Sequence, residues 1–307
     1  MSGLASPPRA AGVPARGGVR AWLLAARPPT LTAAVAPVLV GVGLALRDDS
    51  FKFAPSLAAL FGALALQVGA NFANDVADFR RGADGAGRLG PPRATQQGLL
   101  TARAVIAGAA LAFALAAVAG IYLTLVAGWA VIAIGAVSIL AAVAYTAGPW
   151  PYGYRGLGEL FTFAFFGVLA VAGTYFVQAG TVTDEALAVS LPVALTVSAI
   201  LVVNNVRDLE ADRRAGKRTL AVLLGRRAAR AQFVAMLLLA YLAVVALWLA
   251  GSLSAWVLLP WLSAPFAIAP ARAVLRRADG PSLNRALRET ARLHLAFAAL
   301  LALGITL

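Results

Sequence analysis

Long apolar runs recur along almost the whole chain, and they constrain its fold more than any other feature. Hydrophobic residues make up 61% of the 307 positions and charged residues only 13%, against roughly 25% charged residues in ordinary soluble domains. Apolar runs of about 20 residues have the length of membrane-spanning helices. The sequence therefore predicts an all-α, polytopic membrane protein, a bundle of nine transmembrane helices. Their approximate ranges are 21–46, 53–80, 102–121, 124–146, 157–180, 186–208, 229–251, 253–274 and 287–306.

The domain organisation is simple. Residues 1–19 contain Pro, Gly and scattered Arg without an apolar core, which is typical of a disordered basic leader and not of a signal peptide. Residues 20–307 form one predicted membrane domain, because their longest polar stretches have only loop length. The chain has no cysteine, which excludes disulfides and thiolate metal sites.

Basic residues concentrate on one side of the predicted membrane. The leader and the loops on the same side hold every Lys and Arg except Arg47 and Lys52. The positive-inside rule places this side in the cytoplasm of an inner-membrane protein, and an odd number of spans then places the C-terminus outside. Anionic lipids attract such loops. These basic loops account for the net charge of +13, and the sequence contains no nucleic-acid-binding motif that would indicate a nucleic-acid partner.

Two clusters of Asn and Asp follow apolar runs, both on the predicted cytoplasmic side. The first cluster is 71–78, with sequence NFANDVAD, and the second is 204–212, with sequence NNVRDLEAD. Carboxylates are costly inside a membrane unless a positive charge meets them. Residues spaced four apart share a helix face, so each cluster can present a row of oxygen atoms to the other across the bundle.

The residue types in these clusters suit a hard metal ion. Carboxylate and amide oxygens favour Mg²⁺, which usually shares its coordination with substrate phosphates. A single Asn here reads better as a helix cap, but the clusters lie at C-terminal helix ends, where anions are disfavoured unless cations are near. The predicted metal ligands are Asn74, Asp75, Asp78, Asp84, Asn204, Asp208 and Asp212.

Cations follow each cluster and predict that the metal-bound anion is a diphosphate. The residues expected to neutralise it are Lys217, Arg218, Arg80 and Arg81. In a membrane, a diphosphate with a hydrocarbon tail is a prenyl diphosphate, and its ionisation leaves an allylic cation. The aromatic side chains of 145–176 would exclude water and stabilise that cation.

The two clusters resemble the paired Asp-rich motifs of the UbiA superfamily of intramembrane aromatic prenyltransferases. The resemblance is strongest to its branch of 1,4-dihydroxy-2-naphthoate polyprenyltransferases, which act in menaquinone biosynthesis. It extends over 22–41, 74–84, 156–175 and 204–222. Gly82 occupies a position where the hydroxybenzoate branch usually has another Asp, which favours the naphthoate branch.

The resemblance implies Mg²⁺-dependent transfer of a polyprenyl group from an all-trans polyprenyl diphosphate to dihydroxynaphthoate, with decarboxylation, giving demethylmenaquinone. It implies that Asn74, Asp78, Asp208 and Asp212 organise the Mg²⁺–diphosphate unit. It further implies that phosphate is bound by Lys217, the nearby Arg residues and Arg27. The residues implied near the acceptor are Tyr154, Arg155 and Glu159. Pro29 stands where a Lys is usual, which leaves Arg27 alone in that stretch.

Two alternatives remain open on the residues alone. The same reaction could use another aromatic acceptor, namely 4-hydroxybenzoate, homogentisate or protohaem. A cation-coupled transporter would also need intramembrane carboxylates, but it would place them near the midplane in broken helices. The clusters instead follow complete apolar runs beside basic loops, which favours the enzyme.

Overall fold

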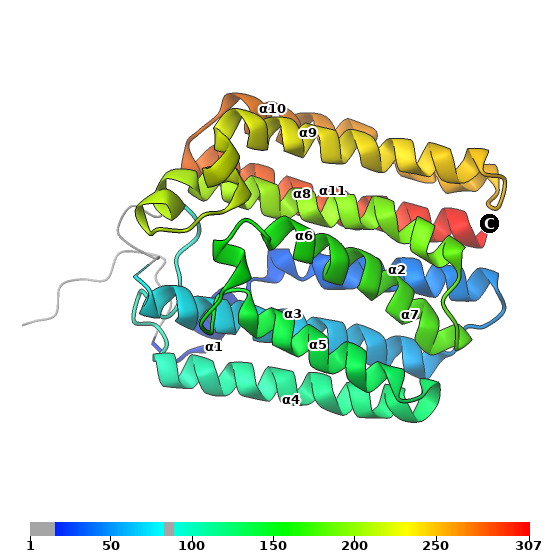
Figure 1. Ribbon diagram of the computed structural model, residues 1–307, viewed down its shortest axis with the longest axis horizontal. Coiled ribbons are helices and arrows are strands. Elements are labelled where there is room, and N and C mark those ends of the chain that lie inside the picture. Colours follow the sequence, from blue (N-terminus) through cyan, green and yellow to red (C-terminus); the bar gives the residue numbers. More distant parts are fainter. Residues whose placement is uncertain (1–15, 83–88) are drawn as a thin grey trace, which may run out of the picture.

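The computed structural model describes residues 16–82 and 89–307, and every regular element in these ranges is helical (Figure 1). The longer helices are α2 (Thr32–Arg47), α3 (Phe53–Arg80), α4 (Ala102–Ala127), α5 (Ala130–Ala144), α8 (Asp184–Arg214), α9 (Leu220–Leu249), α10 (Ala264–Arg276) and α11 (Gly280–Thr306). The shorter ones are α1 (Val19–Ala26), η1 (Pro28–Thr30), η2 (Tyr152–Tyr154), α6 (Gly158–Thr162), the π-helix η3 (Phe163–Leu169), α7 (Ala170–Ala179) and η4 (Ala255–Ser263). Most of the predicted leader and the predicted ligand Asp84 lie outside the described residues.

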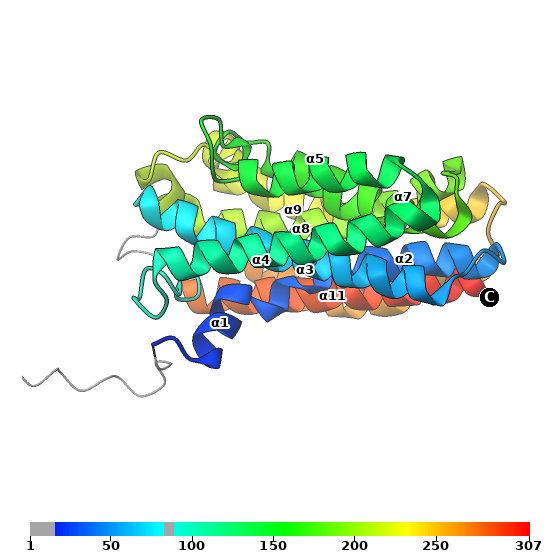
Figure 2. The same cartoon turned by 90° about the horizontal axis from the view of Figure 1, so that it is seen from below.

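The helices lie side by side, with connections at the two ends of the bundle (Figures 1 and 2). One end carries α1, the described connecting residues 81–82 and 89–101, and the connections 145–157, 215–219 and 277–279, and we call it the basic end. The C-terminus lies at the opposite end (Figure 1). The first helix of the domain therefore begins on one side of the bundle and the last helix ends on the other, as an odd number of crossings requires.

The described helices are long and apolar enough for a membrane protein. Seven continuous helical segments meet the requirements for a membrane span, and the bent pair Val19–Thr30 and Thr32–Arg47 makes an eighth. The span predicted at 124–146 corresponds to α5, which has only 15 residues. That is roughly 22 Å of helix, shorter than the hydrocarbon core of about 30 Å. The chain is an integral, multi-pass, all-α membrane protein, and α5 is shorter than predicted.

The first predicted span is broken near its start. Arg27 has a φ of 52°, in the left-handed region, and the helix resumes at a 49° bend. Two prolines follow Arg27, and proline both lacks an N–H and disfavours helical geometry in the residue before it. The break turns Arg27 and Thr30 toward the interior, where both line the central cavity.

Helix α8 is the most buried span, with 72% of its apolar window enclosed. It packs on α9, α11 and η3. Gly167 of η3 lies so close that a Cβ atom there would come within 2.1 Å of the Cβ of Ala194, so only glycine permits this approach. The second cluster is therefore carried by the most enclosed of the candidate spans.

Helix α8 also continues further than predicted, to Arg214 instead of residue 208. Apolar length marks the membrane-embedded part of a helix, whereas Leu, Glu, Ala and Arg continue the helix into the aqueous phase. It ends before Gly216, whose φ is 72°. The second cluster therefore lies within a helix. The connection to α9 is 215–219, and α9 has a kink at Gly225, whose φ is 82°.

Candidate active site

A cavity of about 400 Å³ lies between α2, α3, α4, α5, η3 and α8. The cavity runs along α3 from Asp78 back to Ala59, roughly 28 Å of helix, and its lining from Leu66 to Ala59 is apolar. Its charged and amide-bearing lining residues near the basic end are Arg27, Asn71, Asn74, Asp78, Arg93, Asn204, Asn205, Asp208, Asp212 and Lys217. The cavity thus suits a ligand with a charged group at one end and a long apolar chain.

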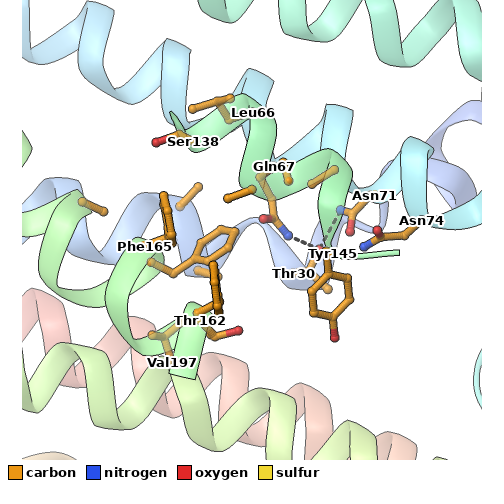
Figure 3. Close-up of a pocket in the computed structure, with 18 of the residues that line it drawn as sticks. Thr30, Leu66, Gln67, Asn71, Asn74, Ser138, Tyr145, Thr162, Phe165 and Val197 are labelled. Atoms are coloured by element: carbon orange, nitrogen blue, oxygen red, sulfur yellow. Dashed lines mark hydrogen bonds between the residues drawn. The ribbon is translucent and has the colours of Figure 1, made fainter. Parts of the chain in front are cut away.

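Polar side chains of α3 mark the boundary between the two parts. Figure 3 shows Gln67 and Asn71 projecting toward the same space as Tyr145 and Phe165. The Nδ2 of Asn71 and the Nε2 of Gln67 donate to the Oγ1 of Thr30, at 2.9 and 3.2 Å. The broken first span is therefore tied to α3 beside the cavity, a contact that the apolar runs alone did not predict.

Asp78 is bound by three groups from distant parts of the chain. Its Oδ1 accepts hydrogen bonds from the hydroxyl of Tyr154 at 2.7 Å and from the Nζ of Lys217 at 3.0 Å. Its Oδ2 accepts from the Nη2 of Arg93 at 3.0 Å. The side chain of Asp78 is only 5% exposed, so these contacts provide the positive charge that a buried carboxylate needs.

Lys217 connects the two clusters. Its Nζ lies 3.8 Å from the Oδ1 of Asp212 as well as 3.0 Å from Asp78, and 4.5 Å from the centre of the Tyr154 ring. Its backbone N–H donates to the carbonyl of Asp212 at 2.9 Å, directly after the turn at Gly216. The predicted meeting of the clusters is thus found, with a lysine between them.

Asp208 is paired inside its own helix. The Nε and Nη2 of Arg207 donate to its two carboxylate oxygens at 2.8 and 2.5 Å. The same guanidinium donates to the Oδ1 of Asn204 at 2.7 Å and to the Oδ1 of Asn284 at 2.9 Å. Arg207 is 2% exposed. Sequence reasoning missed it, although its place between Asn204 and Asp208 was a usable signal.

The remaining predicted metal ligands occupy different positions. Asn74 lines the cavity, and its Oδ1 accepts from the Oγ1 of Thr146 at 2.7 Å. Asp75 is 1% exposed but does not line the cavity, and the polar groups acting on it are Arg27, Thr95 and the backbone of Ala94. Asp75 therefore stays a prediction that this geometry does not support directly.

The predicted phosphate-binding cations fall into two groups. Lys217 and Arg27 line the cavity, whereas Arg80, Arg81 and Arg218 are exposed and do not. The Nη2 of Arg81 donates to the carbonyl of Gly148 at 2.8 Å. Arg93, which sequence reasoning missed, is a further cavity-lining cation. It follows two prolines in a loop, and nothing in that local pattern sets it apart.

The three residues predicted near an acceptor differ as well. Tyr154 lines the cavity. Arg155 is exposed, with its guanidinium 5.0 Å from the centre of the Trp150 ring. Glu159 is 3% exposed and does not line the cavity, but its Oε1 accepts from the Nδ2 of Asn205, which does.

Aromatic rings form a continuous row along the cavity wall. Tyr145 meets Tyr152 edge to face at 5.4 Å, Tyr152 stacks on Phe161 at 4.0 Å, and Phe161 stacks on Phe165 at 5.9 Å between ring centres. All four line the cavity. They begin near the charged end and lead into the apolar part, as the aromatic content of 145–176 predicted.

The electrostatics of the polar end keep Tyr154 a hydrogen-bond donor. Burial, and next the negative charge of Asp78, raise the pKa of its hydroxyl above the usual value. The proton therefore stays on Tyr154 at any physiological pH, and the contact with Asp78 is maintained.

The oxygen ligands of the cavity suit Mg²⁺ only if a substrate supplies part of its coordination. Carboxylates of Asp78, Asp208 and Asp212 reach the cavity from α3 and α8. Within 16–82 and 89–307, however, no three acidic or histidine side chains are close enough to hold a metal ion together. Mg²⁺ commonly uses one or two carboxylates together with water and substrate phosphates. These residues suit a metal ion shared with a diphosphate.

Solved structures with low sequence identity have the same fold. A UbiA homologue from Aeropyrum pernix K1 matches with a TM-score of 0.67 at 19% identity, covering 89% of this chain and 96% of that one. A UbiA homologue from Archaeoglobus fulgidus, solved with DMAPP and Mg²⁺, matches with a TM-score of 0.63 at 15% identity, covering 91% and 98%.

Sequence relatives are much closer. The 1,4-dihydroxy-2-naphthoate octaprenyltransferase of Mycobacterium tuberculosis is 40% identical over 269 residues, covering 88% of this chain and 91% of that protein. The enzyme of the same name from Escherichia coli is 37% identical over 295 residues, covering 94% and 96%. The family profile described as the UbiA prenyltransferase family matches residues 34–301. The chain therefore belongs to the UbiA prenyltransferase family.

Proposed function

We propose that this protein transfers a polyprenyl group from an all-trans polyprenyl diphosphate to 1,4-dihydroxy-2-naphthoate, with Mg²⁺ as cofactor. Carbon dioxide and diphosphate are released, and the product is demethylmenaquinone in its quinol form. The observation that carries the proposal is the convergence of Asp78 and Asp212 on Lys217 at the charged end of an apolar cavity. The acceptor is inferred from the names of relatives that are 37–40% identical.

The charged end would hold the diphosphate. Lys217, Arg27 and Arg93 line it and can bind phosphate oxygens by charge-assisted hydrogen bonds. Asp78, Asp208 and Asp212 would hold Mg²⁺ together with the diphosphate. When bound, Mg²⁺ neutralises charge on the leaving group and orients it. Asn74, which lines the same wall, would contact the same unit.

The apolar part would hold the prenyl chain and protect the reacting carbon. Rupture of its bond to the diphosphate oxygen leaves an allylic cation, which water would consume. The row of aromatic rings excludes water and presents π faces to that cation. The ring carbon that bears the carboxylate then bonds to the allylic carbon, and the positioning of the two supplies much of the rate.

The basic end would face the cytoplasm, with the N-terminus inside and the C-terminus outside. All Lys and Arg except Arg47 and Lys52 lie in the leader or toward this end, which supports the orientation through the positive-inside rule. The water-soluble acceptor and the diphosphate would then enter from the cytoplasm, while the lipid tail stays within the membrane.

The test is an acceptor panel with the full-length protein in lipid nanodiscs. Dihydroxynaphthoate, 4-hydroxybenzoate, homogentisate and protohaem are each supplied with a mixture of prenyl diphosphates and Mg²⁺, and the lipid products are identified by mass spectrometry. We expect a prenylated, decarboxylated naphthoquinol only from the first acceptor. A product from another acceptor alone would overturn the acceptor assignment, and no prenylated product at all would overturn the proposed reaction.

A further inference from the structure

Two consecutive asparagines of α8 line the cavity, and each is bound by a charged residue of opposite sign. The Oδ1 of Asn204 accepts from the Nη2 of Arg207 at 2.7 Å. The Nδ2 of Asn205 donates to the Oε1 of Glu159 at 2.8 Å. Both asparagines belong to the cavity lining. Their environments therefore differ although they are neighbours in the sequence.

The charge of each partner determines how the amide is oriented. A guanidinium only donates hydrogen bonds, so it must face the oxygen of Asn204; a carboxylate only accepts, so it must face the nitrogen of Asn205. The two ends of an asparagine amide are otherwise easily exchanged. Arg207 and Glu159 thus hold the two amides in opposite orientations.

The second atom of each amide has no hydrogen-bond partner among the described residues. Both residues line the cavity, and neither the Nδ2 of Asn204 nor the Oδ1 of Asn205 belongs to the fully enclosed, unpartnered polar atoms of the described chain. The cavity therefore receives a hydrogen-bond donor from Asn204 and an acceptor from Asn205. In this orientation Asn204 offers phosphate an N–H and offers a metal ion no free amide oxygen.

We propose that the Oδ1 of Asn205 accepts a hydrogen bond from a hydroxyl of the aromatic acceptor, and that Glu159 is the residue that positions it. This inference rests on the proposed function. A fully ionised diphosphate and a prenyl chain have no O–H or N–H to give, so among the proposed substrates only the hydroxylated ring can satisfy this oxygen. The aromatic rings of Tyr145 and Phe161 line the same cavity and offer stacking surfaces.

Burial explains why Glu159 acts only through Asn205. It is 3% exposed, its Oε2 has no hydrogen-bond partner in the described structure, and it is absent from the cavity lining. A buried acidic side chain with one unsatisfied oxygen is costly for a membrane helix. Leucine would remove that cost, so the contact with Asn205 is a reason for the acidic residue to be there.

The experiment measures binding of the ring alone to purified full-length protein in nanodiscs, without Mg²⁺ or prenyl diphosphate, by quenching of tryptophan fluorescence. The ligands are dihydroxynaphthoate and its two monomethyl ethers. Loss of one buried hydrogen bond corresponds to about a tenfold change in Kd, so we expect one ether to bind about tenfold more weakly to the wild type. Asn205→Ala should bind the parent ring equally weakly and no longer distinguish that ether.

Variants of Glu159 test the positioning role. Glu159→Leu should reproduce the loss seen in Asn205→Ala, and the double variant should be no weaker than Asn205→Ala because both remove one interaction. Glu159→Gln, which keeps the accepting oxygen, should retain the preference for the parent ring. Asn204→Ala is the matched control: it should weaken prenyl diphosphate binding and leave ring binding unchanged.

Two results would overturn the inference: equal binding of all three ligands by the wild type, or losses in Glu159→Leu and Asn205→Ala that multiply in the double variant. The first uses only the wild type, so it holds even if a variant fails to fold. If the acceptor panel identifies 4-hydroxybenzoate or homogentisate, the same comparison is made with that ring and its methyl ethers, whereas protohaem, which has no ring hydroxyl, would overturn the inference. Failure of the proposed acceptor and failure of this inference are therefore distinguishable.

Discussion

The two acidic clusters obtain their positive charge in different ways. Asp78 of the first cluster is bound by Arg93, Tyr154 and Lys217, which come from three separate connections at the basic end. Asp208 of the second cluster is bound by Arg207, its neighbour in the same helix. Asp78 is therefore held by residues of the loops, whereas Asp208 is held within α8.

This difference indicates a division of roles between the clusters. Helix α8 is the most enclosed span, and its paired Arg207 and Asp208 need no other segment to be in place. Asp78 instead connects loop segments, and its partner Lys217 also lies near Asp212. Substrate binding at the charged end can therefore rearrange the partners of Asp78 more readily than those of Asp208.

The largest effect is expected from Asp78→Asn, which removes the anion but leaves the positive charges of Arg93 and Lys217 near each other. Breaking a buried ion pair on one side typically costs about 3–5 kcal/mol, so we expect a clear fall in thermal stability and at least about a hundredfold loss of turnover. Both are measurable on membranes and on purified protein. Wild-type turnover in this variant would contradict the central place of Asp78.

Asp75→Asn is the matched control for that experiment. Asp75 belongs to the same helix and is equally buried, but it does not line the cavity. We expect it to leave the KM for prenyl diphosphate within about twofold of the wild type, because residue 75 is not part of the cavity lining. A KM increase as large as that of Asp78→Asn would mean that Asp75 reaches the substrate after all.

Arg207→Lys should have a smaller effect, which tests the local pairing of the second cluster. Lysine cannot form the two parallel hydrogen bonds to Asp208 or bind Asn204 and Asn284 at once. Hydrogen bonds to charged groups contribute about 1.5–3 kcal/mol each, and we expect a loss of that order in unfolding free energy. Asn284→Ala removes only one contact of Arg207, so a loss as large as that of Arg207→Lys would show that the pairing depends on α11.

The sequence was sufficient to predict which charged residues of the two clusters lie at one end of the bundle. Residue type and spacing identified Asp78, Asp208, Asp212 and Lys217 as one charged site, because buried carboxylates require cations wherever they occur. The family resemblance added the fold and the reaction. The apolar runs identified the spans, but they ended α8 at residue 208, because hydrophobicity reports the membrane and not the helix.

Other features depend on contacts between distant residues and could not be predicted. Arg93 reaches Asp78 from a loop, and no local pattern distinguishes it from the other loop arginines. The break at Arg27 was readable from the prolines that follow, but its consequence, the contact of Thr30 with α3, was not. The orientation of the Asn205 amide requires knowledge of its partner, Glu159, which is distant in sequence.

Lys217→Ala and Arg218→Ala compare two neighbouring cations at the point where the clusters meet. Lys217 lines the cavity, whereas Arg218 is exposed and outside it. Loss of one charge-assisted contact predicts an increase of about tenfold in the KM for prenyl diphosphate for Lys217→Ala, and no resolved change for Arg218→Ala. Equal effects would mean that long-range charge, and not contact, determines the affinity, and raised salt would then weaken both to the same extent.

The smallest effect is expected from Arg155→Ala, beside Tyr154 at the edge of the first cluster. Arg155 is exposed and lies over the Trp150 ring, so its removal should change stability by less than about 0.5 kcal/mol and leave the acceptor KM unchanged. Tyr154→Phe, its neighbour, removes the hydrogen bond to buried Asp78 and should cost about 1.5–3 kcal/mol. An increase in acceptor KM for Arg155→Ala would restore the role that the family resemblance implied. It would also require the loop 145–157 to close over the cavity when the ring binds, because only then could this side chain reach the ring.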